Sequence, residues 1–205
     1  MNIKSDFRDI CQLNVSALIE KIESLGDEPW YEDVTRQQTF DIHKSTQSIR
    51  LVDNIEPGTT KAKVHPLYAE LKQELAPVLG AVKRDIDKRV NAKKLEKEYG
   101  KSCFVRIVLA RLDEQGEIRR HKDTGESLMY VHRVHCPLIT NDSCDFHVGD
   151  STRKLGVGEI VEINNRRLHG VENNGSQKRV HLIVDYYVPG EKVVDIDGKQ
   201  HICKL

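Results

Sequence analysis

Four residues in the second half of the chain have the types and spacing to bind a metal ion together with an organic acid. His121 and Asp123 lie two positions apart, His169 follows later, and Arg179 stands ten residues beyond His169. Two imidazoles and one carboxylate from separate segments can occupy one face of a metal ion and leave the other face open, a donor set that suits a catalytic Fe(II) ion. An arginine at this spacing suits a co-substrate that carries a carboxylate.

Strand geometry is expected to bring the metal-binding residues together. Side chains alternate along a strand, so His121 and Asp123 would point to one face and Lys122 away from it. His169 is expected to begin a later strand and to supply the third ligand. The H-x-D pair is weak evidence by itself because such pairs occur by chance in many chains of this size. Five other histidines are interpreted as surface or hydrogen-bonded residues: His43, His65, His132, His147 and His201.

The segment from His169 to Asp185 is expected to form a hairpin, and its register decides where Arg179 points. A two-residue loop would send His169 and Arg179 to opposite faces, whereas a three-residue loop at 174–176 would send both to one interior. The sequence therefore predicts an odd-length loop or a bulge, although Asn174-Gly175 favours a two-residue turn. The other face of the strand would pack on the N-terminal helices through three apolar side chains: Val180, Leu182 and Val184.

Arg133-Val-His135 repeats this pattern, with two polar residues on one side of an apolar strand. A buried arginine without an anion is costly, so Arg133 and Arg179 both imply a bound carboxylate or an internal acid. One alternative stays open, in which either arginine pairs with an acidic core residue such as Asp185.

The first hundred residues have mainly helical patterns. Apolar residues at helical spacing predict a helix over 14–25, with Asn14 as its cap and Gly26 at its end. A second stripe predicts helix over 66–99, kinked or split at Pro77. The alternating charges of this second stretch, from 83 to 98, predict a solvated helix face.

After Gly100 the pattern changes to short β-branched runs separated by Gly, Asn and Asp. Strands are predicted at 48–52, 103–112, 128–139, 159–163, 169–173 and 178–187, and a terminal hairpin at 192–203 around Asp197-Gly198. The sequence therefore predicts an α+β, mainly β fold: a jelly-roll or cupin-like barrel with the N-terminal helices packed on one sheet. One domain is expected over 1–205, with a helical support region at 1–100, a catalytic core at 101–190 and a C-terminal hairpin at 191–205.

The composition excludes several classes of function. The 205 residues contain 32 basic and 32 acidic side chains, so no charge excess favours nucleic acid or an anionic membrane. The N-terminus lacks the apolar stretch of a signal peptide, and no apolar run is long enough to span a bilayer. Five widely spaced cysteines without a CxxC pair indicate reduced thiols and predict a cytoplasmic protein.

Three segments together resemble a known family. The runs EIRRHKDTG, YVHRVHCPLITN and GEIVEINNRRLHGVENNGSQKRVHLIVDYY are similar to the aspartyl/asparaginyl β-hydroxylases, whose relatives include bacterial proline hydroxylases. The resemblance covers roughly residues 103–187. It implies a double-stranded β-helix and an Fe(II)- and 2-oxoglutarate-dependent dioxygenase, which hydroxylates a C–H bond with O2 and releases succinate and CO2.

The resemblance also implies roles for individual residues. His121, Asp123 and His169 match the iron ligands, and Arg179 matches the arginine that binds the distal carboxylate of 2-oxoglutarate. Arg133 and His135 match an R-x-H pair that helps to hold the co-substrate. Some members of the family lack the carboxylate ligand, but this chain has Asp123, so the full triad is available. The presence of Asp123 also argues against a halogenase.

Two alternatives concern turnover and substrate. A cupin-like barrel that binds a metal or a small acid without turnover would use the same H-x-D and distant histidine, and zinc could occupy it. The pair Arg133 and Arg179 favours the oxygenase, since a purely structural zinc site needs neither. The substrate is expected to be an amino acid, either free or within a peptide or protein, and no nucleic-acid or membrane partner is expected.

Overall fold

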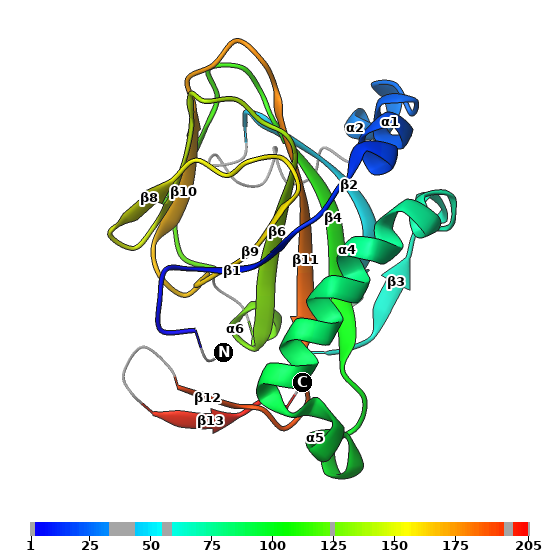
Figure 1. Cartoon of the computed structure of the whole chain (residues 1–205), viewed down its shortest axis with the longest axis vertical. Helices are drawn as coiled ribbons and strands as arrows, with labels where there is room; N and C mark the ends of the chain where they lie inside the picture. The colour runs from blue at the N-terminus through cyan, green and yellow to red at the C-terminus, as the bar shows by residue number, and fades with distance from the viewer. Residues whose placement is uncertain (1–2, 33–43, 55–58, 124–125, 195–198, 205) are drawn as a thin grey trace.

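Two antiparallel sheets face each other in the computed structural model, as Figure 1 shows, and the structure describes residues 3–32, 44–54, 59–123, 126–194 and 199–204. The larger sheet has the strand order β1 (Phe7–Gln12), β9 (Glu159–Ile163), β6 (Val131–Ile139), β11 (Arg179–Tyr187), β4 (Cys103–Leu112), β2 (Thr46–Asn54) and β3 (Ala62–Val64). The smaller sheet has the order β5 (Glu117–His121), β10 (His169–Asn173), β7 (Cys144–Val148) and β8 (Ser151–Arg153). This mainly β architecture is the double-stranded β-helix that the sequence predicted.

The outer face of the larger sheet is covered by α1 (Ser16–Glu23), α2 (Glu28–Tyr31), α4 (Pro66–Val90) and α5 (Ala92–Tyr99). The short α6 (Glu126–Met129) stands between β5 and β6 in the chain. α4 lies across the sheet in Figure 1. The long helical segment splits at Asn91 and not at Pro77, because Asn91 adopts the left-handed conformation with φ 54°. Asparagine tolerates that conformation, and α4 continues through Pro77.

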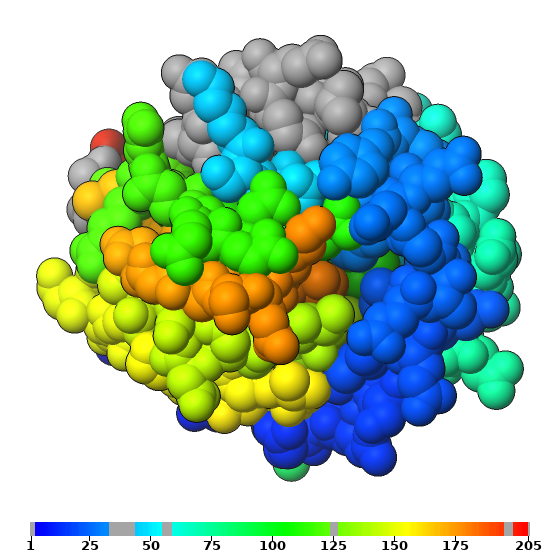
Figure 2. Space-filling model, turned by 90° about the horizontal axis from the view of Figure 1, so that it is seen from above, coloured from blue at the N-terminus to red at the C-terminus, as the bar shows by residue number. Residues whose placement is uncertain are grey.

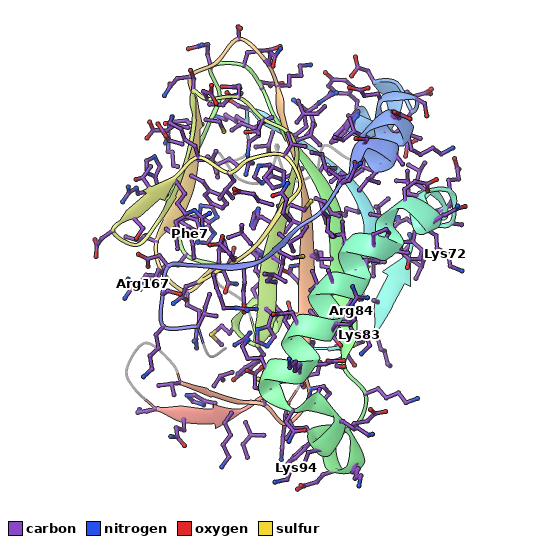
Figure 3. All side chains as sticks on the ribbon, in the orientation of Figure 1. Phe7, Lys72, Lys83, Arg84, Lys94 and Arg167 are labelled. Atoms are coloured by element: carbon purple, nitrogen blue, oxygen red, sulfur yellow. The ribbon has the colours of Figure 1, made fainter. Side chains whose placement is uncertain are left out.

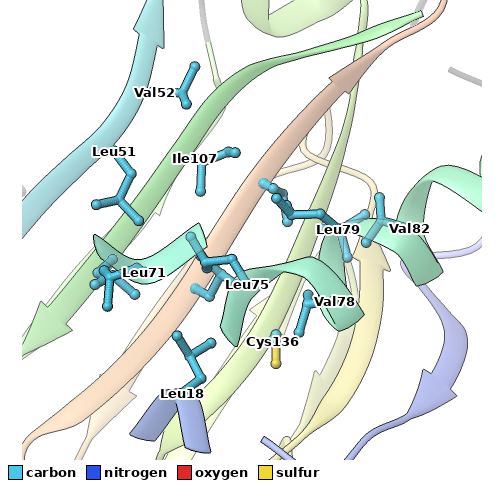
Figure 4. Close-up of a cluster of buried hydrophobic side chains, with 14 of the residues drawn as sticks. Leu18, Leu51, Val52, Leu71, Leu75, Val78, Leu79, Val82, Ile107 and Cys136 are labelled. Carbon is cyan, nitrogen blue, oxygen red and sulfur yellow. The ribbon is translucent and has the colours of Figure 1, made fainter. Parts of the chain in front are cut away.

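The main core lies between these helices and the larger sheet. Figure 4 shows Leu71, Leu75, Val78 and Val82 of α4 pointing toward the strands, with Leu18 of α1 beside them. The opposing layer includes three fully buried side chains of β11: Val180, Leu182 and Val184. The predicted packing of this face on the N-terminal helices is therefore confirmed. Alternation along β11 leaves Arg179, His181 and Ile183 for the interior between the two sheets.

The predicted hairpin from His169 to Asp185 is wrong. β10 belongs to the smaller sheet and β11 to the larger one, so the residues between them cross from one sheet to the other. Arg179 nevertheless reaches the same interior as His169, because the two sheets face each other. A loop-length argument cannot detect this crossover, since it assumes that consecutive strands pair.

Several other strands depart from the predictions. Strands 103–112, 159–163 and 169–173 have the predicted bounds, whereas β1, β3, β7 and β8 were not predicted. Three of the strands, β1, β2 and β3, come from the first hundred residues, which thus extend the larger sheet at both edges. The terminal hairpin forms by pairing of β12 (Lys192–Val194) with β13 (Gln200–Ile202), and its predicted turn at Asp197-Gly198 lies outside the described residues.

The charged face of α4 is only partly solvated. Lys72, Lys83 and Arg84, labelled in Figure 3, are exposed. Asp85 and Arg89 instead form ion pairs with Arg8 and Glu162, beneath the helix. None of the helices described is both long and apolar enough to span a membrane.

A buried ionic network joins α4 to β1, β6 and β9. His132 of β6 has no exposed surface and lies 2.7 Å from a carboxylate oxygen of Glu162 through Nδ1 and 2.7 Å from one of Glu191 through Nε2. Glu162 also accepts hydrogen bonds from Arg8 and Arg89. A carboxylate can only accept, so both ring nitrogens of His132 donate and the imidazole is the charged form. Nη2 of Arg89 lies 3.1 Å from Nδ1 of His132 but donates to Glu162, at 3.0 Å.

His132 and Glu162 of this network have pKa values shifted in opposite directions. Burial lowers the pKa of His132, but hydrogen bonds and charge from Glu162 and Glu191 outweigh burial and raise it above its ordinary value. Burial raises the pKa of Glu162, but His132, Arg89 and Arg8 outweigh burial and lower it to about 2. A histidine whose pKa is raised in the folded state makes its full contribution to stability below its unfolded pKa of about 6.5. That contribution is lost as the pH rises through the pKa of the folded state.

His132→Ala should lower the free energy of unfolding by about 3 kcal/mol at pH 6, since it leaves two buried carboxylates without their partner. The difference from the parent should shrink as the pH rises above 6.5, and urea unfolding across pH 5–9 measures it. His201→Ala, on the exposed terminal strand, should change stability by less than about 0.5 kcal/mol. A difference that grows with pH would contradict a charged His132.

Candidate active site

The pairing of β5 with β10 brings the two candidate metal-binding histidines together. His121 is the last residue of β5, His169 is the first of β10, and the antiparallel register sets them opposite each other. Their ring centroids lie 4.5 Å apart. β5 and the loop before it appear in green in Figure 2, directly against the orange surface of β10 and the loop after it.

Asp123 joins this pair from outside the strand. β5 ends at His121, so the expected alternation of His121 and Asp123 along one strand is wrong. The backbone N–H of Asp123 instead donates to the carbonyl of Asn165 at 3.3 Å, which holds the segment against the loop before β10. Nε2 of His169 lies 3.7 Å from Oδ2 of Asp123 and Nε2 of His121 lies 4.0 Å from Oδ1. One ligand atom from each residue falls within 4.8 Å of the other two.

Backbone carbonyls fix the tautomer of both histidines. Nδ1–H of His121 donates to the carbonyl of Arg119 at 2.8 Å, and Nδ1–H of His169 donates to that of Arg167 at 3.0 Å. A carbonyl can only accept, so each Nδ1 carries the proton and each Nε2 keeps its lone pair. Both lone pairs are therefore available on the nitrogens nearest Asp123.

The Asp123 carboxylate is oriented by two donors. Its Oδ2 accepts from Nη1 of Arg133 at 2.5 Å and from Nδ2 of Asn165 at 3.1 Å. Burial would raise the pKa of Asp123, but the charge of Arg133, the neighbouring His169, the hydrogen bond from Asn165 and the neighbouring His121 together lower it below its ordinary value. The carboxylate is thus ionised at neutral pH and retains Oδ1 for a metal ion. Sequence reasoning missed Asn165, which has no exposed surface and carries no motif.

The trio matches a metal site of the 2-His-1-carboxylate type. Two neutral imidazoles and one ionised carboxylate are the donor set for Fe(II) with open positions, and hydrogen bonds behind the ligands orient them. Of the three side chains, His169 is buried, and His121 and Asp123 are partly exposed.

Arg133 has its charge balanced by two acids. Nε and Nη2 donate to the two carboxylate oxygens of Asp185 at 2.8 and 2.7 Å, and Nη1 donates to Asp123. Asp185 has no exposed surface and also accepts from Arg106. The alternative left open by the sequence, pairing with Asp185, therefore holds for Arg133.

Arg179 has no such partner. Its side chain is 2% exposed, and no carboxylate forms an ion pair with it among the residues that the structure describes. Nη2 donates to Nδ1 of His181 at 2.7 Å, while the buried Nε has no hydrogen-bond partner in the described structure. Burial lowers the pKa of Arg179 to about 10, so the guanidinium is still charged at neutral pH. A buried cation of this kind needs an anion.

One cavity connects Arg179 with the two histidines. It encloses about 580 Å³, part of which is open to solvent, and its lining includes His121, His169, Arg133, His135 and Arg179. Further lining residues that sequence reasoning did not assign to the site are Gln47, Ser48, Ile118, Phe146, Gly170 and Ile183.

His135 adds a second unpaired polar atom to this cavity. It is 5% exposed, and its Nε2 is buried with no partner within the described residues. Burial, followed by the charges of Arg179 and Arg133, holds the pKa of His135 well below its ordinary value, so the ring is neutral. The unpaired atoms of His135 and Arg179 mark a polar pocket that a bound acid would complete.

Gly170 sets the distance between the strands that carry the histidines. A Cβ on Gly170 would lie 2.7 Å from the carbonyl oxygen of Ile118 and 3.0 Å from the amide nitrogen of Arg120, both backbone atoms of β5. A bulge between His169 and Val171 accompanies this close approach. Only glycine therefore allows β5 to lie this close to β10.

Gly170→Ala should push β5 away from β10, separate His121 from His169 and weaken Co(II) binding roughly tenfold or more. Titration of the protein with Co(II) measures the loss. Gly156→Ala is the matched control, because a Cβ there meets nothing closer than 3.7 Å. Unchanged Co(II) affinity in Gly170→Ala would show that strand spacing does not limit the site.

A family model described as aspartyl/asparaginyl β-hydroxylase matches residues 89–189. The matched region is similar to that family and contains all six residues that the sequence assigned to the site. The match confirms the resemblance drawn from the three motifs and indicates a hydroxylase. No curated protein sequence is significantly similar to the chain.

Solved structures share the fold over most of the chain. A prolyl hydroxylase from Trichoplax adhaerens, in complex with a peptide fragment of hypoxia inducible factor, has a TM-score of 0.59 and 11% identity, over 90% of this chain and 84% of that one. A prolyl-4-hydroxylase from Pseudomonas putida has a TM-score of 0.57 and 10% identity, over 91% and 95% of the two chains. A 2OG-Fe(II) oxygenase family protein from Burkholderia pseudomallei has a TM-score of 0.55 and 13% identity, over 90% and 95%. At these identities the likeness concerns the fold alone.

Proposed function

We propose that the protein is an Fe(II)- and 2-oxoglutarate-dependent dioxygenase that hydroxylates a C–H bond of an amino-acid residue. The observation that carries this proposal is one cavity whose lining includes His121, His169 and the buried Arg179, which has no carboxylate partner among the described residues. Asp123 lies beside the two histidines and completes a His-Asp-His trio. A site that only bound a metal would need the trio but not Arg179. Similarity to a hydroxylase family supports turnover over the alternative of a non-catalytic metal or acid binder.

In this proposal His121, Asp123 and His169 hold the iron. Their hydrogen bonds to the Arg119 and Arg167 carbonyls, and from Arg133 and Asn165, keep the three ligand atoms directed at one point. When bound, the iron would supply the activation of O2 that couples decarboxylation of 2-oxoglutarate to hydroxylation.

The co-substrate would lie between the iron and the buried end of the cavity. Arg179 would bind the distal carboxylate of 2-oxoglutarate, which supplies the anion that this guanidinium lacks. His135 would contribute its unpaired Nε2. Arg133 lines the same cavity, but with Asp123 and Asp185 bound it would act there with little net charge and mainly hold Asp123 in place.

A peptide or protein is the proposed carrier of the target residue. The Trichoplax enzyme, which has this fold, binds a peptide, and that likeness favours a peptide over a free amino acid. We also propose a cytoplasmic location, which is supported by the five cysteines, all of them free thiols in the structure.

The proposal predicts succinate release that requires Fe(II), 2-oxoglutarate and O2 and rises when a substrate peptide is supplied. A library of short peptides, read by mass for a gain of one oxygen, identifies the substrate. Asp123→Ala should lower succinate release at least about 100-fold, because loss of one ligand weakens the metal site and frees Arg133. The neighbouring exposed residue provides the control Lys122→Ala, which should retain parental activity. Metal-independent succinate release, or full activity in Asp123→Ala, would contradict the proposal.

A further inference from the structure

The two arginines of the cavity are held in opposite ways. Arg133 forms ion pairs with two carboxylates, which cancel its charge. Arg179 has no carboxylate partner in the described part of the chain, and the acceptor of its Nη2 is the ring nitrogen Nδ1 of His181. The sequence had assigned no role to His181.

His181 lies behind Arg179 on the same strand. It is two residues further along β11, so both side chains point to the same interior, and it is 1% exposed. Its Nδ1 lies 2.7 Å from Nη2 of Arg179 and 3.4 Å from Nδ1 of His135. The ring of Phe146 lies edge-on to it, with centroids 6.3 Å apart. This packing leaves His181 little freedom to turn.

The contact with Arg179 defines the protonation of His181. An arginine can only donate, so Nδ1 of His181 must accept and its ring must be neutral, with the proton on Nε2. Burial, followed by the charge of Arg179 and the neighbouring His135, keeps the pKa of His181 well below its ordinary value, in agreement with this state.

A neutral acceptor has an effect that an acid cannot have. It satisfies one N–H group of a buried guanidinium and fixes the direction of the fork, yet it leaves the net positive charge in place. An aspartate in the same place would form an ion pair, as Asp185 does with Arg133. The incoming carboxylate would then meet a neutralised site.

We infer that His181 is a positioning residue that holds Arg179 through a neutral acceptor and so preserves the preference of the cavity for a 2-oxo diacid over a 2-oxo monoacid. The inference rests on the proposed function, because it assumes that Arg179 binds the distal carboxylate of the co-substrate. His181 would act through Arg179, without touching the reacting atoms.

Two variants of His181 that have the same shape as each other, but differ in charge, test the effect of charge. His181→Asn keeps a neutral oxygen acceptor near the position of Nδ1, whereas His181→Asp puts a negative charge there. Binding of 2-oxoglutarate and of 2-oxobutanoate to the Mn(II)-loaded protein is measured by calorimetry without oxygen. The ratio of the two affinities should stay within about threefold of the parent value in His181→Asn. It should fall roughly tenfold or more in His181→Asp, through weaker diacid binding alone.

Reference variants separate this effect from a loss of folding. Val184→Ala, on the other face of β11 and fully buried, should lower stability but leave the affinity ratio unchanged. Arg179→Met gives the ratio expected when the distal site is lost. If His181→Asp does not fold, His181→Leu replaces it, and its ratio should also fall because the acceptor is gone.

The outcomes distinguish this inference from the proposed function. A parent protein that shows no preference for the diacid would overturn the role of Arg179 and the inference with it. A parent that prefers the diacid, with the same preference in His181→Asp, would overturn the inference alone. Equal losses in His181→Asn and His181→Asp would also overturn it, since charge would then not matter.

Discussion

The close approach of β5 to β10 is the constraint on which the site depends. The antiparallel register sets His121 opposite His169, and the absence of a side chain at Gly170 lets the two backbones come near enough for their imidazoles to share an ion. Asp123 lies just beyond the end of β5, where its backbone N–H donates to the carbonyl of Asn165 and its carboxylate accepts from the Asn165 side chain. The three candidate ligands are thus positioned mainly by backbone geometry and by hydrogen bonds behind them.

Charge is balanced almost everywhere in the described interior, and this makes Arg179 informative. On the helix side of β6, His132 lies between Glu162 and Glu191. On the cavity side of the same strand, Arg133 lies between Asp123 and Asp185. Arg179 is as deeply buried as these groups but faces only neutral rings and an open cavity. Because these other buried charges are paired, the unpaired charge of Arg179 agrees with the proposed binding of a diacid.

The sequence predicted the fold class, and the residues that it assigned to the site lie close together, although not for the reasons given. The apolar alternation of β11 correctly identified Val180, Leu182 and Val184 as the face under the helices, because alternation is a local property. The hairpin expected from His169 to Asp185 was wrong, since pairing between sheets is a tertiary property that a turn motif does not encode. Pro77 does not split its helix, because α4 is held along the sheet by its buried stripe. Asn165, Gly170 and His181 could not be found from motifs, since their roles come from contacts across the fold.

We propose that His121, Asp123 and His169 hold one iron within reach of a diacid bound at Arg179. Addition of 2-oxoglutarate to the Fe(II)-loaded protein without oxygen is a direct test, because a 2-oxo acid that chelates Fe(II) gives a visible charge-transfer absorption band. We expect the band in the parent protein, its loss in His169→Ala, and its appearance in Arg179→Met only at much higher 2-oxoglutarate concentration. A parent protein that binds Fe(II) but gives no band, or a band of full strength in His169→Ala, would show that these residues do not form the proposed site.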